Sequence, residues 1–75
     1  MLEKIFGQVL KEIREEKGLS QEFVALESSL DRTYISLLER GLRNPTISTL
    51  FKLSSTLKKT PSEIISLVEK RYENS

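Results

Sequence analysis

The sequence predicts an all-α protein, a compact bundle of five short helices in a single domain of 75 residues. Apolar residues recur at three- and four-residue steps, and no stretch alternates apolar and polar residues as a half-buried β-strand does. Residues that start and stop helices divide the chain into five segments. The chain also contains no cysteine, so no disulfide bond contributes to its stability.

The first helix is expected from about Leu2 to Lys17, because its apolar side chains share one face. These side chains are Leu2, Ile5, Phe6, Val9, Leu10 and Ile13. Gly18 follows the last charged turn and suits the left-handed position at which many helices end.

Two shorter helices are expected next, one from Ser20 to about Ser28 and one from Asp31 to about Arg40. Serine and aspartate are both favoured N-cap residues, because their side chains accept a hydrogen bond from a free backbone N–H. Val24 and Ala25 are expected to point inward from the first of these helices. The inward side of the second is expected to hold Ile35, Leu38 and Leu42. Gly41 ends it.

The fourth helix is expected to begin after Pro45, to be capped by Thr46 or a neighbour, and to reach about Lys58. Its wide apolar face is predicted to contain Ile47, Leu50, Phe51, Leu53 and Leu57.

The fifth helix, expected over about residues 61–70, has the sharpest start signal in the chain. Thr60 stands at the N-cap, Pro61 at the first helical position and Glu63 at the third, which together form a capping box. The polar residues 71–75 are expected to be a frayed tail.

Composition removes several classes of function. Without histidine or cysteine, the chain has no imidazole or thiolate for a metal site, for acid–base catalysis or for nucleophilic attack. We therefore expect no enzyme, no metal and no cofactor. No signal peptide and no apolar run of membrane-spanning length are recognised, which predicts a cytoplasmic protein. The net charge is only +1, and residues 19–45 have three basic and four acidic residues, so bulk charge does not indicate a nucleic-acid ligand.

Residues 20–40 nevertheless form two short helices around a turn of three or four residues, which is a helix-turn-helix. The second helix of this motif enters the major groove of DNA. At 100° per residue, its inward side is expected to hold Ile35, Leu38 and Glu39. Its outward side is expected to hold Thr33, Ser36, Leu37 and Arg40, and Arg32 and Tyr34 are expected to flank this side. Arginine can bind guanine in a bidentate manner, and the threonine methyl group can contact thymine. Leu37 either contacts a thymine methyl group or is half-covered by a neighbouring loop.

The run GLSQEFVALESSLDRTYISLLERGLRNPTISTLFKL resembles the Cro/CI-type (XRE-like) family of helix-turn-helix regulators, with likeness over residues 5–68. The strings LDRTYIS, ER and RNPT resemble in particular the controller proteins of restriction–modification systems. The resemblance implies a bundle of the lambda-repressor-like type and a homodimer that binds a palindromic operator in double-stranded DNA. It also implies autoregulation, as an activator and a repressor. No membrane partner is expected without an apolar span, and no small-molecule ligand is expected in so short a chain. The alternatives are a phage-type repressor, an antitoxin, or a helix-turn-helix fold used as a protein-interaction module.

The resemblance also assigns DNA contacts to positions of the motif and of the loop that follows it. These are Gln21, Arg32, Thr33, Tyr34, Ser36, Arg43 and Asn44. Tyr34 has an alternative role in packing at the helix edge, and Arg43 and Asn44 are alternatively plain turn residues. Phe23 and Leu26 stand where the family often has charged residues, and either pack on the first helix or form a contact surface.

Two further assignments follow from the resemblance. Arg14 and Glu39 match a pair that bridges the first and third helices, the alternative being an ordinary surface pair of little consequence. The fifth helix resembles a dimerisation element, and one short helix does not easily bury all its apolar side chains against a single protomer. The expected interface residues are Ile64, Ile65, Leu67 and Val68. Ser29 stands where the family often has a turn glycine.

Overall fold

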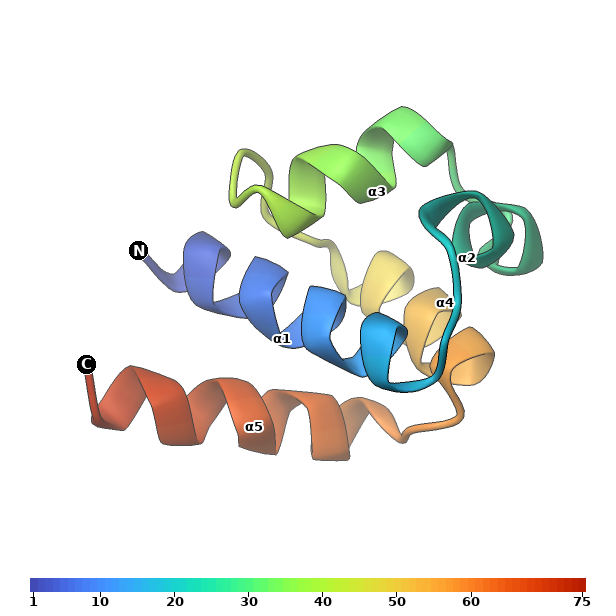
Figure 1. Cartoon of the computed structure of the whole chain (residues 1–75). Helices are drawn as coiled ribbons and strands as arrows, with labels where there is room; N and C mark the ends of the chain where they lie inside the picture. Colours follow the sequence, from blue (N-terminus) through green and yellow to red (C-terminus); the bar gives the residue numbers. More distant parts are fainter.

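The computed structural model describes all 75 residues and contains five α-helices and no strand, which confirms the predicted fold class. The helices are α1 (Leu2–Glu16), α2 (Gln21–Ser28), α3 (Arg32–Glu39), α4 (Ile47–Leu57) and α5 (Pro61–Glu73). Figure 1 shows α1 lying between α3 and α5, with both chain termini on the same side of the molecule. α2 packs on α3 and α4, and α4 also contacts α5. No helix combines the length and the apolar character needed to cross a membrane.

Local hydrogen bonds define the starts of the helices. Ser20, Thr46 and Thr60 each accept a hydrogen bond from the backbone N–H three residues further on, at 3.0, 3.0 and 3.1 Å. Thr60 also takes part in the complete capping box that the sequence predicts. Asp31 occupies the N-cap of α3, but its carboxylate makes no hydrogen bond to the helix. The capping prediction therefore fails at this one position, where α3 begins without a side-chain acceptor.

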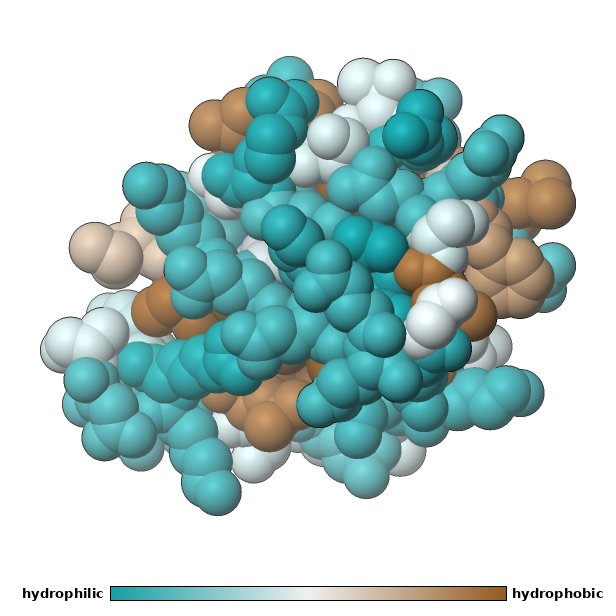
Figure 2. Space-filling model, in the orientation of Figure 1, coloured by the Kyte–Doolittle hydropathy of each residue, from teal (hydrophilic) through white to brown (hydrophobic).

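The core lies where all five helices meet and contains fourteen buried hydrophobic residues. They are Ile5, Phe6, Val9, Leu10, Ile13, Val24, Ala25, Ile35, Leu38, Leu50, Leu53, Leu57, Ile64 and Val68. Most of α1's apolar face is among them, whereas its opposite face is hydrophilic and dominates the surface in Figure 2. Burial of this continuous apolar surface is the main favourable contribution to folding.

Four apolar residues that were assigned to inward apolar faces lie on the surface instead. One is Leu2, at the start of α1. Ile47 and Phe51 are 73% and 59% exposed, and Leu42 is also exposed. α4 contacts α2 and α5 through the opposite part of its circumference, so no helix of this chain covers Ile47 and Phe51. Leu42 lies beyond the left-handed Gly41 (φ +74°), where the helical period no longer determines its direction.

The end of α5 also differs from the expectation. The helix continues to Glu73, whereas a frayed tail was predicted from residue 71. Arg71 forms an ion pair with Glu12 of α1, with 3.0 Å between Nη1 and Oε2. This contact joins residues far apart in the sequence, so the local polarity of the tail gave no sign of it.

α1 and α3 approach each other closely at Gly7. A β-carbon at this position would lie against the Leu38 carbonyl oxygen and 2.8 Å from that of Glu39. Both distances are shorter than real β-carbon contacts, so only glycine fits here without movement. Gly7 thus sets how deeply α3 sits on α1.

Candidate nucleic-acid interface

α3 presents one face to the core and the other to solvent, as its sequence pattern predicts. Ile35, Leu38 and Glu39 are buried, whereas Arg32 and Thr33 are exposed. Ser36 and Leu37 are half-buried on the outer side, so Leu37 is partly covered. Figure 1 shows α3 along one edge of the molecule, where no other helix lies over its outer side.

A polar hollow lies between the start of α2 and the first turns of α3. It has a volume of about 180 Å³ and is lined by Gln21, Arg32, Thr33 and Ser36, with no hydrophobic residue. The fold therefore brings together four of the seven residues predicted to contact DNA. An amide, a guanidinium group and two hydroxyl groups are donors suited to phosphate oxygens and base acceptors.

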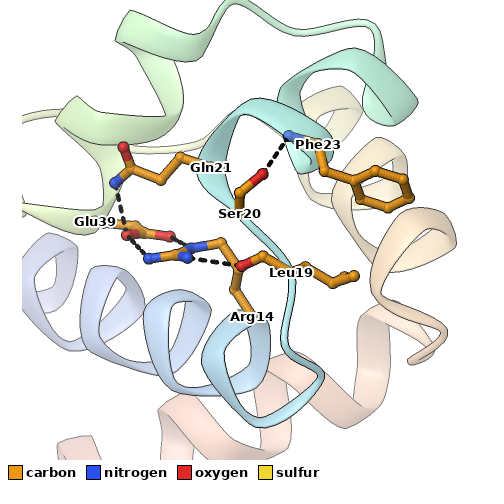
Figure 3. Close-up of polar contacts among 6 residues, drawn as sticks. All are labelled: Arg14, Leu19, Ser20, Gln21, Phe23 and Glu39. Carbon is orange, nitrogen blue, oxygen red and sulfur yellow. Dashed lines mark hydrogen bonds and ion pairs between the residues drawn. The ribbon is translucent and has the colours of Figure 1, made fainter.

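Arg14 and Glu39 join α1 to α3 beneath this hollow. Arg14 Nε lies 2.6 Å from Glu39 Oε2, and Nη2 lies 3.0 Å from Oε1. Arg14 Nη1 also donates to the Leu19 carbonyl at 2.8 Å. Figure 3 shows Gln21 reaching across from α2, where its Nε2 donates to Glu39 Oε1 at 2.9 Å. One network thus connects α1, the loop before α2, and both helices of the motif.

Burial makes this network different from a surface ion pair. Arg14 and Glu39 are each only 9% exposed, and the hydrogen bond to Glu39 raises the pKa of the Arg14 guanidinium above its usual value. The guanidinium group and the carboxylate neutralise each other and share two hydrogen bonds. No buried side-chain nitrogen or oxygen atom of the chain lacks a hydrogen-bond partner. Breaking such a pair by removing one partner costs far more than losing an exposed pair.

The burial of Glu39 also changes the charge that α3 and the loop after it present to solvent. Among residues 31–46, Arg32, Arg40 and Arg43 are exposed, and the only exposed acidic residue is Asp31. The surface here is therefore basic, although residues 19–45 as a whole have one more acidic than basic residue. Arg40 was placed on the outer face by helical geometry but was not included among the DNA contacts. Its charge and exposure mark it as a further candidate.

The other three predicted contact residues lie at the edges of this surface. Tyr34 is half-buried against the core, and its hydroxyl lies 3.3 Å from Thr49 Oγ1 of α4. Asn44 and Arg43 are exposed in the loop after α3, where Arg43 Nη1 donates to the Leu42 carbonyl at 3.1 Å. The packing role of Tyr34 is therefore present in the free protein, and its contact with DNA stays a prediction.

The predicted dimer residues of α5 divide into two groups. Ile64 and Val68 lie in the chain's own core, so they are not available to a second copy and the prediction needs correction there. Ile65 and Leu67 remain exposed, but they are two residues apart and point in nearly opposite directions around the helix. Leu67 lines a groove with Val9 and Ile13 of α1. Helical periodicity identified the apolar face but not which helix would cover it.

The sequence model of a family described as helix-turn-helix matches residues 10–64, which includes both helices of the motif and all residues of the polar hollow. The chain belongs to this helix-turn-helix family. Among curated relatives, it is 48% identical over 66 residues to the control protein C.MunI from Mycoplasma sp.. The match covers 87% of this chain and 89% of that protein.

Solved structures of helix-turn-helix controller proteins have the same fold. The restriction–modification controller protein C.AhdI from Aeromonas hydrophila superimposes with a TM-score of 0.80 and 45% identity, over 83% of this chain and 94% of that one. The C.Esp1396I controller tetramer, solved in complex with its natural 35 base-pair operator, gives a TM-score of 0.85 and 40% identity. That match covers 93% of this chain and 92% of the other. The resemblance to restriction–modification controllers is thereby confirmed.

Proposed function

We propose that this helix-turn-helix protein is a dimeric, sequence-specific regulator that binds a palindromic operator and controls restriction–modification genes. The observation that carries the proposal is the polar hollow between Gln21 and the first turns of α3, with exposed arginines along the same surface. This surface offers donors for phosphates and base edges. The operator complex of C.Esp1396I, a protein 40% identical to this chain, supports the same class of ligand.

Base recognition is assigned to the outer face of α3. Arg32, Thr33 and Ser36 project from the first turns of the helix, which enter the major groove first in this motif. Arg32 is suited to guanine, and the hydroxyl groups of Thr33 and Ser36 are suited to either donors or acceptors on bases. Tyr34 stands beside them at the edge of the face.

Phosphate contacts are assigned to residues on either side of α3. Gln21 keeps one amide N–H free after donating the other to Glu39. Arg43 and Asn44 are exposed in the loop after α3. Arg40 is exposed as well, and its positive charge adds to those of Arg32 and Arg43. These contacts would fix the position of the protein on the duplex without reading its sequence.

A second copy of the chain is the proposed occupant of the uncovered side of α4. Ile47 and Phe51 lie one turn apart and are among the most exposed apolar residues of the protein. α4 contacts α5, where Ile65 is also exposed. A palindromic operator needs two recognition helices related by a two-fold axis, and burial of these side chains would supply the driving force for pairing. This surface adds α4 to the interface first predicted from α5, of which Ile65 is exposed and Ile64 and Val68 are buried.

Sedimentation equilibrium tests the dimer surface. Ile47→Lys should shift the protein toward monomers, because a buried lysine without a partner is strongly unfavourable. Leu26→Lys is the matched control, since Leu26 is 76% exposed on α2 and should leave the dimer unchanged. An unaltered dimer in the Ile47 variant would place the interface elsewhere.

Autoregulation is part of the proposal. C.Esp1396I is a tetramer on its natural operator, which supports two dimers of the present chain binding side by side. A first dimer would activate transcription, and a second dimer beside it would repress it. The proposed activity is binding alone, without catalysis, cofactor or small-molecule ligand. The proposed place of this activity is the cytoplasm.

Selection of bound duplexes from a random pool at about physiological salt tests the central proposal, because nonspecific phosphate attraction is weakened there. An enriched inverted repeat is expected. Arg32→Ala should then weaken binding by about 1–3 kcal/mol and relax specificity at one position of each half-site. Lys70→Ala, which removes an exposed charge from α5, should bind as the parent does. Equal binding of selected and scrambled DNA by the parent would refute the proposal.

The exposed face of α2 favours a protein-interaction module as the second candidate. Phe23 and Leu26 are exposed there between Glu22 and Glu27, whose charges oppose contact with DNA. Figure 3 shows Phe23 pointing away from the Gln21 network. Recovery of a partner protein that Leu26→Ser abolishes, together with the absence of measurable DNA affinity, would favour this candidate.

A further inference from the structure

Three hydroxyl groups connect α3 to the first turn of α4. Thr46, the N-cap of α4, accepts the backbone N–H of Thr49 at 3.0 Å and donates its own proton to Thr49 Oγ1 at 3.0 Å. Thr49 Oγ1 in turn lies 3.3 Å from the hydroxyl of Tyr34 on α3. Because Thr49 already accepts the Thr46 proton, its own proton is available to the Tyr34 oxygen. The phenol proton is then free for an acceptor outside the protein.

Burial separates the roles of Thr49 and Tyr34. Thr49 is only 6% exposed, so it cannot contact a DNA duplex docked on the outer face of α3. Tyr34 is half-buried, and its ring packs against the hydrophobic core. The ring is therefore held by packing, and its hydroxyl by Thr49. Two points of attachment fix the direction of a side chain that one point would leave free to rotate.

We propose that Thr49 is a positioning residue that holds the Tyr34 phenol at the edge of the DNA-facing surface, so that sequence discrimination by α3 depends on a buried hydroxyl group of α4. This inference rests on the proposed function, in which the first turns of α3 read bases. Groups held in place before binding lose less conformational freedom when they bind. Loss of the Thr49 hydroxyl is therefore expected to reduce discrimination through Tyr34.

The test compares variants that lose the hydroxyl group but keep the shape of the side chain with one that keeps the hydroxyl group. Thr49→Val and Tyr34→Phe each break the link, Thr49→Ser keeps it, and Tyr34→Phe with Thr49→Val breaks it twice. Thr56→Val is the matched control, because Thr56 is a half-buried threonine of α4 with no hydrogen bond to α3. The assay measures discrimination as the dissociation constant for single-base variants of the operator divided by that for the selected operator. Thermal melting monitors folding.

Thr49→Val and Tyr34→Phe are expected to lower this ratio by a similar factor of roughly two to ten, the range for one neutral hydrogen bond. The double variant should lose no more than either single one. Thr49→Ser and Thr56→Val should discriminate as the parent does. In the free protein, three-bond couplings should show a single Tyr34 χ1 rotamer in the parent and a mixture in Thr49→Val.

Results that contradict the inference about Thr49 can be distinguished from results that contradict the proposed function. Unchanged discrimination in Thr49→Val, or additive losses in the double variant, would overturn the inference and leave the proposed function intact. If Thr49→Val fails to fold, unchanged discrimination in Tyr34→Phe overturns it equally. A parent protein that selects no sequence would overturn the proposed function, and the inference with it.

Discussion

Gly7→Ala tests the close contact that holds α3 against α1. Gly7 lies within α1, where its missing side chain lets α3 approach with the Leu38 and Glu39 carbonyl groups directly above it. An alanine β-carbon would lie 2.8 Å from the Glu39 oxygen and closer still to that of Leu38. Because these are backbone atoms, the contact is relieved only by moving one helix away from the other.

Two opposing effects set the magnitude of the change in stability that Gly7→Ala causes. Overpacking a well-packed interior costs typically about 1–3 kcal/mol. Alanine regains roughly 0.5–1 kcal/mol relative to glycine within a helix. The net expectation is a destabilisation of about 1–2 kcal/mol, which lowers the melting temperature of a domain this small by roughly 4–15 °C. Movement of α3 should also lengthen the Arg14–Glu39 pair and weaken DNA binding, because α3 carries the proposed base-reading residues.

Thermal melting and urea unfolding of the purified variant measure this effect. Gln8→Ala is the matched control, since the neighbouring Gln8 is exposed and the substitution should change stability by no more than about 0.5 kcal/mol. If Gly7→Ala were as stable as the parent, or more stable, helix propensity would outweigh the contact. The close seating of α3 on α1 would then be refuted.

Three further outcomes are expected. Arg14→Met should destabilise the fold by about 3–5 kcal/mol in urea unfolding, because it leaves the buried Glu39 carboxylate unpaired; a loss below about 1 kcal/mol would mean that the pair is solvated. Ser29→Gly should stabilise by up to about 1 kcal/mol, because Ser29 has a left-handed φ of +59°, and a lower melting temperature would contradict this. The pKa of Glu63 is lowered by the backbone N–H of the α5 N-cap and that of Glu12 by Arg71. Each carboxylate therefore contributes stability above its unfolded pKa of about 4.3, and this is lost as pH falls through the lowered folded value. Melting temperature should fall as the solution is acidified below about pH 4.5, less steeply in Glu63→Gln, and an unchanged slope in that variant would exclude the capping box as a cause.

Features that depend on neighbouring residues were predictable from the sequence. The capping box at Thr60 and the left-handed Gly18 were both identified from residue types at fixed spacings, and both are present. The same holds for the inward face of α3. Hydrogen bonds at helix ends and the 3.6-residue period involve positions a few residues apart, so the chain contains the necessary information locally.

The candidate site was predictable in part. Gln21, Arg32, Thr33 and Ser36 were named from helical geometry and the family resemblance, and the fold brings them around one hollow. The bond from Tyr34 to Thr49 was not anticipated. A tyrosine at the edge of a helix can turn toward several neighbours, and the sequence does not specify which hydrogen-bonding partner lies within reach.

The sequence by itself determined that this chain forms five helices, where they begin, and that two of them make a helix-turn-helix. These properties follow from short-range geometry and residue preference. The tertiary structure alone decided that Ile47 and Phe51 stay exposed while Ile64 and Val68 are buried. The resemblance matched Arg14 with Glu39, but only the tertiary structure decided that this pair is buried, which leaves a basic surface on a nearly neutral protein. Burial and charge pairing depend on which helices touch, and those contacts join residues far apart along the chain.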